Sequence, residues 1–298
     1  MGVGRETEER LPRPRGPWLR AARRFARRPL GVAALLVFAV LVGAALLGGR
    51  ITPYFVNQMN MQLINRPRSP TFHGSHFFGT DVFGRDIFSQ SLYALHTTVR
   101  IALLVAAVAG IFGVVVGATA GYAGGWVDAV LMRLVDLVVT VPALAVILVL
   151  FVYISPVTDE HIGYVLMAYM WTGVARVVRA RCVSLRDREF VEAAHASGAS
   201  PLRIVLRHLL PNCSGAIIVA TTSVFGQFIV LSATLDYFNV GTSQLSGPTL
   251  GNLLADATKY GPLSQAPWWT YVMPALVLVV LLACVNFVGD CLDDALAG

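Results

Sequence analysis

The chain has 298 residues, of which 56% are hydrophobic and only 13% are charged, and its net charge at pH 7 is +6. A soluble domain carries roughly a quarter charged residues, so this composition indicates an integral membrane protein and excludes an ordinary soluble globule. A positive charge can also accompany nucleic-acid binding. Here the arginines cluster at the edges of apolar runs and form no stripe interleaved with aromatic residues, so we expect no nucleic-acid partner.

Residues 1–29 are rich in arginine and proline and too polar to fold alone. They are interpreted as a basic cytoplasmic tail whose last arginines meet the anionic headgroups of membrane lipid. A secretory signal peptide is the competing interpretation of residues 1–49. It is rejected because the apolar run exceeds the ~7–15 residues of a signal core, and because five more apolar runs follow.

Six apolar stretches predict an all-α polytopic membrane protein with about six transmembrane helices, using a window of roughly 20 residues. Residues 30–97 are expected to hold the first helix and an external loop, residues 98–290 the transmembrane core, and residues 291–298 a cytoplasmic tail. The predicted spans are Leu30–Gly49, Thr98–Tyr122, Leu134–Ile154, Ile162–Val178, Gly215–Leu235 and Thr270–Gly289.

The distribution of arginine predicts the orientation of these spans. Nine arginines precede the first span and seven lie between Arg176 and Arg207, whereas the segments on the opposite side hold far fewer basic residues. The positive-inside rule therefore places both termini on the cytoplasmic side of the membrane. A long external segment follows from about Arg50 to Thr97, and a cytoplasmic loop from about Arg179 to Asn212.

Small and polar residues within the spans predict how the helices pack. Gly113, Gly117 and Gly121 repeat every four residues, so they share one helix face and allow another helix to approach closely. Asp136 follows Arg133 by one turn and is expected to pair with it, with a transport or proton-relay role as the alternative. The four cysteines lie in or beside apolar runs without the spacing of a zinc or redox site, and are expected to be reduced packing residues: Cys182, Cys213, Cys284 and Cys291.

A polar strip in the fifth span has two open interpretations. It can supply hydrogen bonds between helices, or it can line a polar pathway through the membrane. The residues concerned are Thr222, Ser223, Gly226, Gln227 and Ser232, with Asp236 at the end of the span.

The segment near residues 186–212 predicts a helix, a turn and a second helix. Gly198 suits the left-handed position that closes the first helix, Ser200 can cap the second, and Pro201 fits its first turn. Ala193 and Ala194 give the first helix a shallow surface beside a glutamate, which favours close docking to another protein. An ordinary amphipathic loop is the alternative.

This segment resembles the EAA loop of the permease subunits of ATP-binding-cassette importers. Glu192-Ala193-Ala194, Gly198 and Leu210-Pro211 have the spacing of that motif, and its ending resembles the dipeptide, oligopeptide and nickel branch. Three further stretches are similar to that branch and to its C-type permease subunit: Gly79-Thr80-Asp81 with Gly84-Arg85-Asp86, Gly121-Tyr122-Ala123-Gly124-Gly125-Trp126-Val127-Asp128, and Gly289-Asp290-Cys291-Leu292-Asp293-Asp294-Ala295-Leu296.

The sequence also departs from the family pattern. Cys291 and Asp293 replace a glycine and an arginine near the C-terminus. At the end of the fifth span, where the family often has a glutamate and a Leu-Ser-Phe-Leu-Gly run, this chain has Ser232 and Leu235-Asp236-Tyr237-Phe238-Asn239.

The resemblance implies a location in the bacterial inner membrane, a cytoplasmic coupling helix and a division of labour. This chain and a homologous second permease subunit would form the path, one or two cytoplasmic ATPase subunits would bind ATP and Mg, and an extracytoplasmic protein would capture small peptides. The coupling residues would be Glu192, Ala193, Ala194, Gly198, Ser200, Pro201, Arg203 and Pro211. The chain itself is expected to hold no cofactor or metal and no ATPase site, because its only lysine, Lys259, lacks the glycine-rich run of a phosphate-binding loop.

Other functions remain open at this stage. Within the same family, nickel chelates, haem or another small solute could be the cargo. A proton-coupled secondary transporter would need intramembrane carboxylates, discontinuous helices and internal repeats, and the apolar spans are nearly free of carboxylates. An intramembrane hydrolase would need a paired nucleophile and base, but the histidines lie outside the span cores.

Overall fold

The computed structural model describes residues 23–52, 54–55, 58–64, 66–71, 76–153, 158–238, 240, 247–259 and 267–297. Within these ranges the regular secondary structure is helical, apart from one isolated bridge between Thr80 and Asp86. The elements are α2 (Pro29–Ile51), η1 (Met61–Leu63), α3 (Ile87–Ala123), α4 (Gly125–Thr140), α5 (Ala143–Tyr153), α6 (Asp159–Arg186), α7 (Glu189–Ala196), α8 (Pro201–Ile204), η2 (Val205–Leu209), α9 (Leu210–Tyr237), α11 (Leu250–Lys259) and α12 (Trp269–Ala297).

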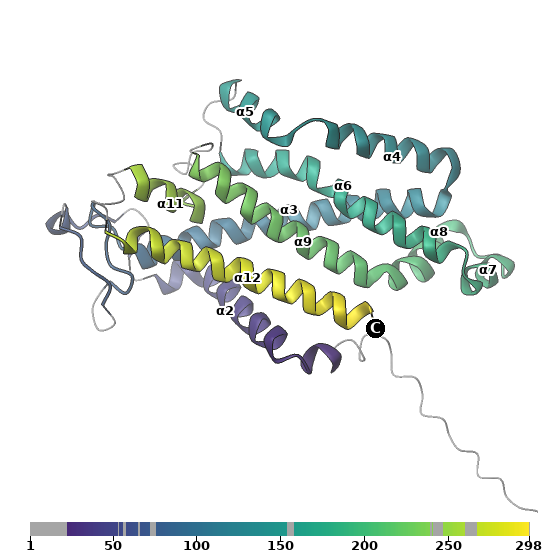
Figure 1. Cartoon of the computed structure of the whole chain (residues 1–298), viewed down its shortest axis with the longest axis horizontal. Coiled ribbons are helices and arrows are strands. Elements are labelled where there is room, and N and C mark those ends of the chain that lie inside the picture. The colour runs from purple at the N-terminus through teal and green to yellow at the C-terminus, as the bar shows by residue number, and fades with distance from the viewer. Residues whose placement is uncertain are drawn as a thin grey trace, which may run out of the picture.

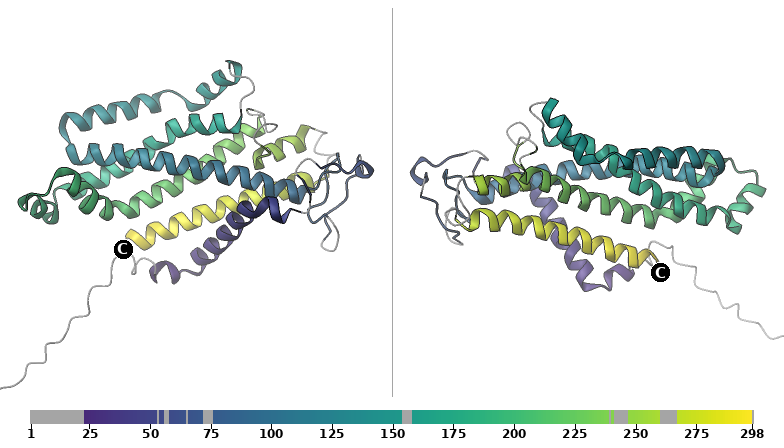
Figure 2. Two further views of the ribbon diagram at one scale, coloured as in Figure 1. Left: turned by 180° about the vertical axis from the view of Figure 1, so that it is seen from behind. Right: turned by 45° about the horizontal axis from the view of Figure 1, so that its top comes forward.

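The long helices form one bundle with α3, α6 and α9 at its centre (Figure 1). Helices α12 and α2 pack on one side of this centre, and α4 and α5 lie on the other (Figure 2). The short helices α7 and α8 lie at the same end of the bundle as the start of α2 and the end of α12, where Arg28 pairs with Asp294. The segment before α3 and helix α11 lie at the opposite end.

Four described helices are long and apolar enough to cross a membrane: α2, α3, α12 and the continuous run from α8 to α9. Helices α4 and α5 make a fifth span if they are counted as one. The remaining expected span, Ile162–Val178, corresponds to α6, which has 28 residues but is less apolar than the others because its second half carries several arginines. Helix α6 packs against both α3 and α9, so much of its surface contacts other helices and is not left to face lipid.

The third predicted span is not one helix, as the sequence pattern suggested. It divides into α4 and α5, which meet at a bend of 58°. Pro142 lies at the break and Val141 before it is extended, with φ −83° and ψ 120°. Proline disfavours the helical conformation in the preceding residue and cannot donate a backbone hydrogen bond, so the helix ends here.

The glycine repeat of α3 packs directly on α6, as its spacing predicted. A Cβ atom built on Gly117 would lie 2.4 Å from the carbonyl oxygen of Ala175. A Cβ atom on Gly113 would lie 2.6 Å from Cβ of Val174, and one on Gly121 would lie 2.6 Å from Cβ of Cys182. The absence of side chains therefore sets the distance between the two central helices.

Ion pairs join α4 to the polar half of α6. Asp128 accepts hydrogen bonds from both Nε and Nη2 of Arg179, at 2.5 and 2.6 Å. Asp136 accepts a hydrogen bond from Arg176 at 2.9 Å. The prediction that Asp136 pairs with Arg133 is therefore wrong, because the neighbouring helix brings a basic side chain to the same carboxylate.

The four cysteines are free and buried, as predicted. The sulfur atoms of Cys182 on α6 and Cys213 on α9 lie 3.7 Å apart in the core of the bundle. They fill the space between two helices near the end that carries α7.

Candidate coupling hairpin and translocation face

Helices α7 and α8 and the turn between them, residues 189–204, form a compact unit that we call the coupling hairpin. Gly198 has φ +74°, so it occupies the left-handed conformation predicted for the turn. Pro201 occupies the first turn of α8 and Ser200 its N-cap position. The Ser200 side chain makes no capping hydrogen bond, so only the position, not the expected contact, is found.

Ala194 faces the inside of the hairpin. Its methyl group is 9% exposed and belongs to a small apolar cluster with Val191, Ile204 and Leu209. The prediction that Ala193 and Ala194 share one docking surface is therefore corrected, because only Ala193 is exposed. Ala194 instead holds α7 against the helix that follows.

The outer surface of the hairpin combines polar, small and apolar groups. Glu192, Ala193, Ser200, Pro201 and Arg203 are all exposed, as a docking role requires. Sequence reasoning missed the large apolar side chains among them, because a leucine in a helical loop gives no sign of the side it faces. These exposed apolar residues are Phe190 and Leu202 in the hairpin, and Leu206 in η2, which continues the same surface.

The hairpin also contacts the end of α3. The rings of His195 and Tyr122 stack with an angle of 6° between their planes and 6.1 Å between centroids. The Tyr122 hydroxyl lies 3.3 Å from Nε2 of His195. The hairpin is thus held by the central helix as well as by its own core.

The second helix of the hairpin continues into the membrane without a break. Residues 201–237 form one candidate span of 37 residues, in which α8, η2 and α9 follow one another. The sequence pattern placed this second helix in a cytoplasmic loop up to Asn212 and began the following span at Gly215. Pro211 lies in the first turn of α9, directly after the π-helical turn η2, which widens the helix at the point where proline removes a hydrogen bond. Nδ2 of Asn212 donates to the carbonyl of His208 at 2.6 Å and reinforces this turn.

The predicted polar strip of α9 divides between an exposed face and the bundle interior. Ser223 and Gln227 are exposed, Thr222 and Ser232 are partly buried, and Gly226 is buried. A Cβ atom on Gly226 would meet Val285 and Asn286 of α12 at 3.5 Å, so this glycine belongs to a helix contact.

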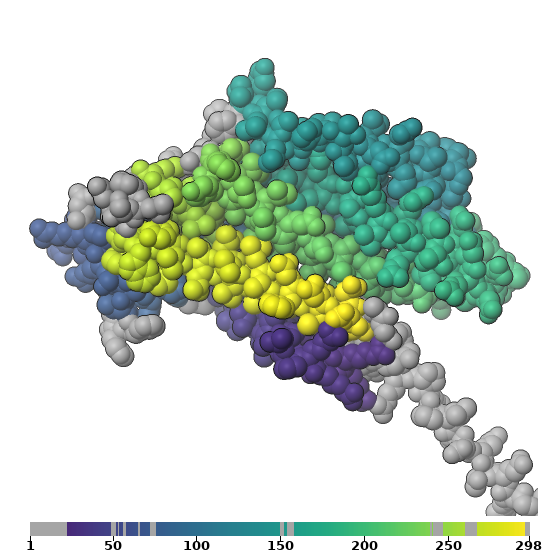
Figure 3. Space-filling model, viewed as in Figure 1, coloured from purple at the N-terminus to yellow at the C-terminus, as the bar shows by residue number. Residues whose placement is uncertain are grey.

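Asp236 is also buried and does not lie on the exposed face. The interpretation as a pathway lining therefore fits only part of the strip. Thr234 continues the exposed face of α9. The predicted polar strip does not include it, because its spacing from Gln227 is informative only when the orientation of the helix is known. Part of α9 lies open between α12 and α6 on the face seen in Figure 3.

The Gly-Thr-Asp and Gly-Arg-Asp residues, 79–81 and 84–86, build a turn and begin α3. Asp81 accepts hydrogen bonds from the backbone of Phe83 and Arg85 and from Nε of Arg85. Gly79 and Gly84 have φ values of +78° and +72°, which favours glycine at both positions. Asp86 caps α3 through the backbone N–H of Ser89 at 2.8 Å and contacts the buried His76 at 3.0 Å.

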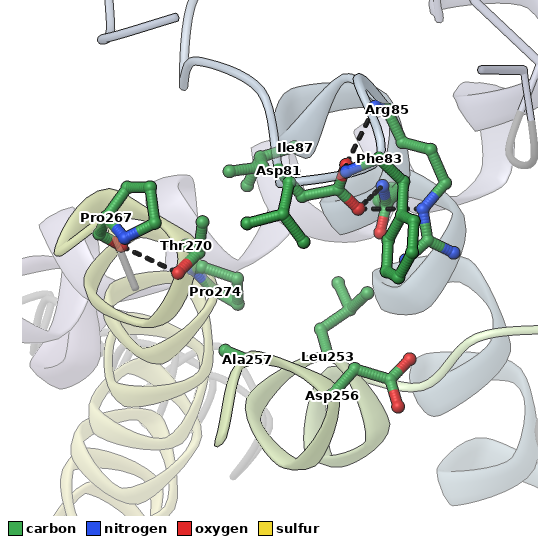
Figure 4. Close-up of a pocket in the computed structure, with 12 residues that line it drawn as sticks. Asp81, Phe83, Arg85, Ile87, Leu253, Asp256, Ala257, Pro267, Thr270 and Pro274 are labelled. Atoms are coloured by element: carbon green, nitrogen blue, oxygen red, sulfur yellow. Dashed lines mark hydrogen bonds and ion pairs between the residues drawn. The ribbon is translucent and has the colours of Figure 1, made fainter. Parts of the chain in front are cut away.

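This turn covers a cavity of about 40 Å³ at the end of the bundle opposite the coupling hairpin (Figure 4). Asp81 and Arg85 face Leu253 and Asp256 of α11 across it. The indole N–H of Trp269 at the start of α12 donates to the carbonyl of Thr80 at 3.1 Å. The turn therefore connects α3 to α12 and covers that end of the helix bundle.

Replacing Asp86 with alanine is expected to lower the free energy of unfolding by about 1–2 kcal/mol, because α3 loses its N-cap. Asp86→Asn is the matched control, since asparagine caps helices about as well as aspartate. Thermal unfolding of the detergent-purified variants measures the difference. Equal stability of Asp86→Ala and the native chain would contradict the assigned capping role.

Comparisons with known proteins agree with this architecture. Residues 113–298 match the family described as binding-protein-dependent transport system inner membrane component. Residues 16–68 match the N-terminal transmembrane domain of oligopeptide transport permease C. The chain is 31% identical to the oligopeptide transport system permease protein OppC of Mycobacterium tuberculosis, over 92% of each chain. It is 29% identical to OppC of Haemophilus influenzae, over 99% of this chain and 92% of that protein.

A solved structure also shares the fold. A chain of the MetNI methionine ABC transporter, in an inward-facing conformation, superposes with a TM-score of 0.53 at 21% identity, covering 69% of this chain and 97% of that one. This likeness concerns the fold, and the family match over residues 113–298 identifies the chain as a membrane transport permease. The chain belongs to the binding-protein-dependent transport system inner membrane component family, as an OppC-type permease.

Proposed function

We propose that this chain is one of two permease subunits in an ATP-driven importer of small peptides. The relatives whose names specify oligopeptide transport support this substrate class, because they align with nearly the whole chain. A homologous second permease would complete the path. One or two cytoplasmic ATPase subunits would bind ATP and Mg, and an extracytoplasmic protein would deliver the peptide.

The uninterrupted helix from the coupling hairpin to α9 is the observation that carries this proposal. A displacement of α7 and α8 by a docked ATPase would be passed through η2 to α9 without an intervening hinge loop. The exposed side chains of Ser223, Gln227 and Thr234 lie on that same helix. Nucleotide-driven movement at one end would therefore reorient polar groups along a path shared with the second permease.

The exposed surface of the coupling hairpin is the proposed ATPase contact. Leucine side chains that are 68% and 56% exposed, at positions 202 and 206, can enter an apolar groove on the partner. Glu192 and Arg203 can fix the orientation of the contact through charge. This arrangement resembles the insertion of a short amphipathic helix into a groove.

Transport by the reconstituted complex tests the proposal. The chain should co-purify with a second permease and ATPase subunits, and vesicles containing the complex should accumulate a labelled dipeptide or oligopeptide when ATP and the capture protein are present. Uptake of a nickel chelate or haem in place of peptide would retain the importer mechanism and reject the substrate class. Active transport by the purified chain alone would reject the importer.

The proposed orientation predicts a difference in chemical labelling. Met61→Cys, at a side chain that is 80% exposed before α3, should react with an impermeant thiol reagent in intact cells. Leu202→Cys in the coupling hairpin should react only after the membrane is opened and the ATPase subunits are removed. The four native cysteines are buried and provide a low background. Labelling of Leu202→Cys alone in intact cells would reverse the orientation.

The segment before α3 is proposed to contact the capture protein. Two positions of this segment lie outside the described residues: Ser75, which is a further site for cysteine labelling, and Asn57, where the shortening described below begins. Phe55 and Met61 are 80% exposed, which leaves large apolar groups available at this end of the chain. Shortening the segment between residues 57 and 69 should reduce uptake while the ATPase subunits still assemble. Unchanged uptake would make the segment a passive loop.

A further inference from the structure

Two aspartates meet in the interior of the bundle. Asp159 lies at the start of α6 and Asp236 near the end of α9, and their residues are only 5% and 1% exposed. Both line one cavity of about 10 Å³, together with the hydroxyl-bearing residues Thr98, Ser232 and Thr249. A space of this size holds about one water molecule. The two carboxyl groups therefore share a small, enclosed polar site.

Four side-chain polar atoms of this site have no hydrogen-bond partner among the described residues. One oxygen of Asp236 accepts a hydrogen bond from the Thr249 hydroxyl at 2.5 Å, and Thr249 in turn accepts one from the backbone N–H of Asn252 at 3.1 Å. The other Asp236 oxygen, both Asp159 oxygens and Nδ2 of Asn252 are buried without a hydrogen bond. Buried polar atoms normally have hydrogen-bond partners, so these unpartnered atoms indicate that a hydrogen bond or a bound group is still to be assigned at this site.

The surrounding charged groups do not neutralise the two aspartates. On α6, Glu160 adds another negative charge and pairs at 2.7 Å with Arg100 of α3, both at exposed positions. The His161 ring is turned toward Thr158, whose backbone N–H donates to its Nδ1. On α11, Asp256 and Lys259 pair with each other at 3.2 Å.

The remaining titratable group of α9 close to this site in sequence is Tyr237, whose side chain is exposed. No basic side chain of the described residues therefore forms an ion pair with either aspartate. Two ionised carboxylates side by side in a buried site repel each other and lack solvation. One positive charge between them removes both costs, and a proton is the only cation that needs no further ligands.

We propose that Asp159 and Asp236 form a proton-binding site, in which one carboxyl group donates its proton to the other carboxylate. The resulting hydrogen bond joins α6 to α9 beside α11. It uses two of the unpartnered oxygens and leaves one net negative charge, toward which the Thr249 hydroxyl and the Asn252 amide can donate. This inference concerns the chain itself and does not depend on its cargo or on its ATPase partners.

The site makes folding depend on pH with a defined sign. The folded chain holds one proton at neutral pH, where two separate aspartates of an unfolded chain are both deprotonated. Stability therefore decreases as pH rises and that proton is lost. Asp236→Asn and Asp159→Asn should remove the dependence, because the amide donates permanently to the remaining carboxylate.

Thermal unfolding of the detergent-purified chain from about pH 6 to about pH 9 tests the proposal. The melting temperature of the native chain should fall across this range, while those of Asp236→Asn and Asp159→Asn should change much less. Asp256→Asn, a carboxylate on α11 outside the site, is the control and should follow the native chain. Equal slopes for all four proteins would overturn the proposal.

Infrared spectroscopy gives a second readout, which detects the bound proton directly and does not measure unfolding. The native chain should show the carbonyl band of a buried protonated carboxylic acid, and each single asparagine variant should lose it. Retention of the band in both variants would place the proton elsewhere. Recovery of the high-pH melting temperature by sodium or calcium, but not by choline at equal ionic strength, would identify a metal-cation site and reject the proton.

Discussion

Replacing Gly117 with leucine is expected to prevent the packing of α3 on α6 and to abolish accumulation of the folded chain. Even a Cβ atom at this position would lie 2.4 Å from the backbone oxygen of Ala175, which cannot turn away as a side chain could. Overpacking of this kind costs about 3 kcal/mol or more, a large part of the roughly 5–15 kcal/mol that stabilises a folded protein.

Gly173→Leu is the matched control for the contact between α3 and α6. Gly173 lies on α6, but a Cβ atom there would meet nothing within 4 Å. The control should therefore accumulate and unfold like the native chain when it is expressed alone. Membrane yield and thermal unfolding in detergent measure both variants. A stable Gly117→Leu chain would mean that α3 and α6 do not approach as closely as described.

Ala194→Arg is expected to abolish transport by unfolding the coupling hairpin from within. The methyl group of Ala194 lies against Val191, Ile204 and Leu209, and a long charged side chain does not fit in that cluster. The cost is about 1–3 kcal/mol from overpacking, with a further penalty for burying a charge. Uptake by reconstituted vesicles and retention of ATPase subunits during purification measure the effect.

Ala193→Arg separates the internal packing of the hairpin from its docking. Ala193 is exposed, so its replacement should leave hairpin packing intact and act only on the ATPase contact. Limited proteolysis of the chain alone should therefore detect an opened hairpin in Ala194→Arg and not in Ala193→Arg. Identical proteolysis of the two variants, with normal transport by Ala194→Arg, would remove this hairpin from the coupling mechanism.

The features that sequence predicts well here are those determined by a few neighbouring residues. The glycine spacing of α3 identifies a close helix contact because four-residue spacing alone places the glycines on one face. Gly198 and Pro201 similarly define a turn and a helix start through their own backbone preferences. The family membership follows from motifs of the same local kind, and the comparisons confirm it.

Features that depend on contacts between distant helices were predicted less well. The partner of Asp136 is Arg176, forty residues away, and the direction faced by Ala194 depends on Ile204 and Leu209. The argument against a secondary transporter also requires correction. The third span is discontinuous, and Asp159 and Asp236 bring carboxylates together in the bundle interior. The importer class therefore rests on the family assignment. It does not rest on the absence of discontinuous helices or of carboxylates within the bundle.

The continuous helix from α8 to α9 also sets a mechanical scale. Its 37 residues span about 55 Å at 1.5 Å per residue. If the helix pivots at the coupling hairpin, a tilt of about 10° displaces its far end by about 10 Å, close to the full diameter of a helix. Over the first two turns of α8 and η2, the same tilt moves the backbone by only about 2 Å. A side-chain-sized shift at the hairpin therefore corresponds to a helix-sized opening at the opposite end of the bundle.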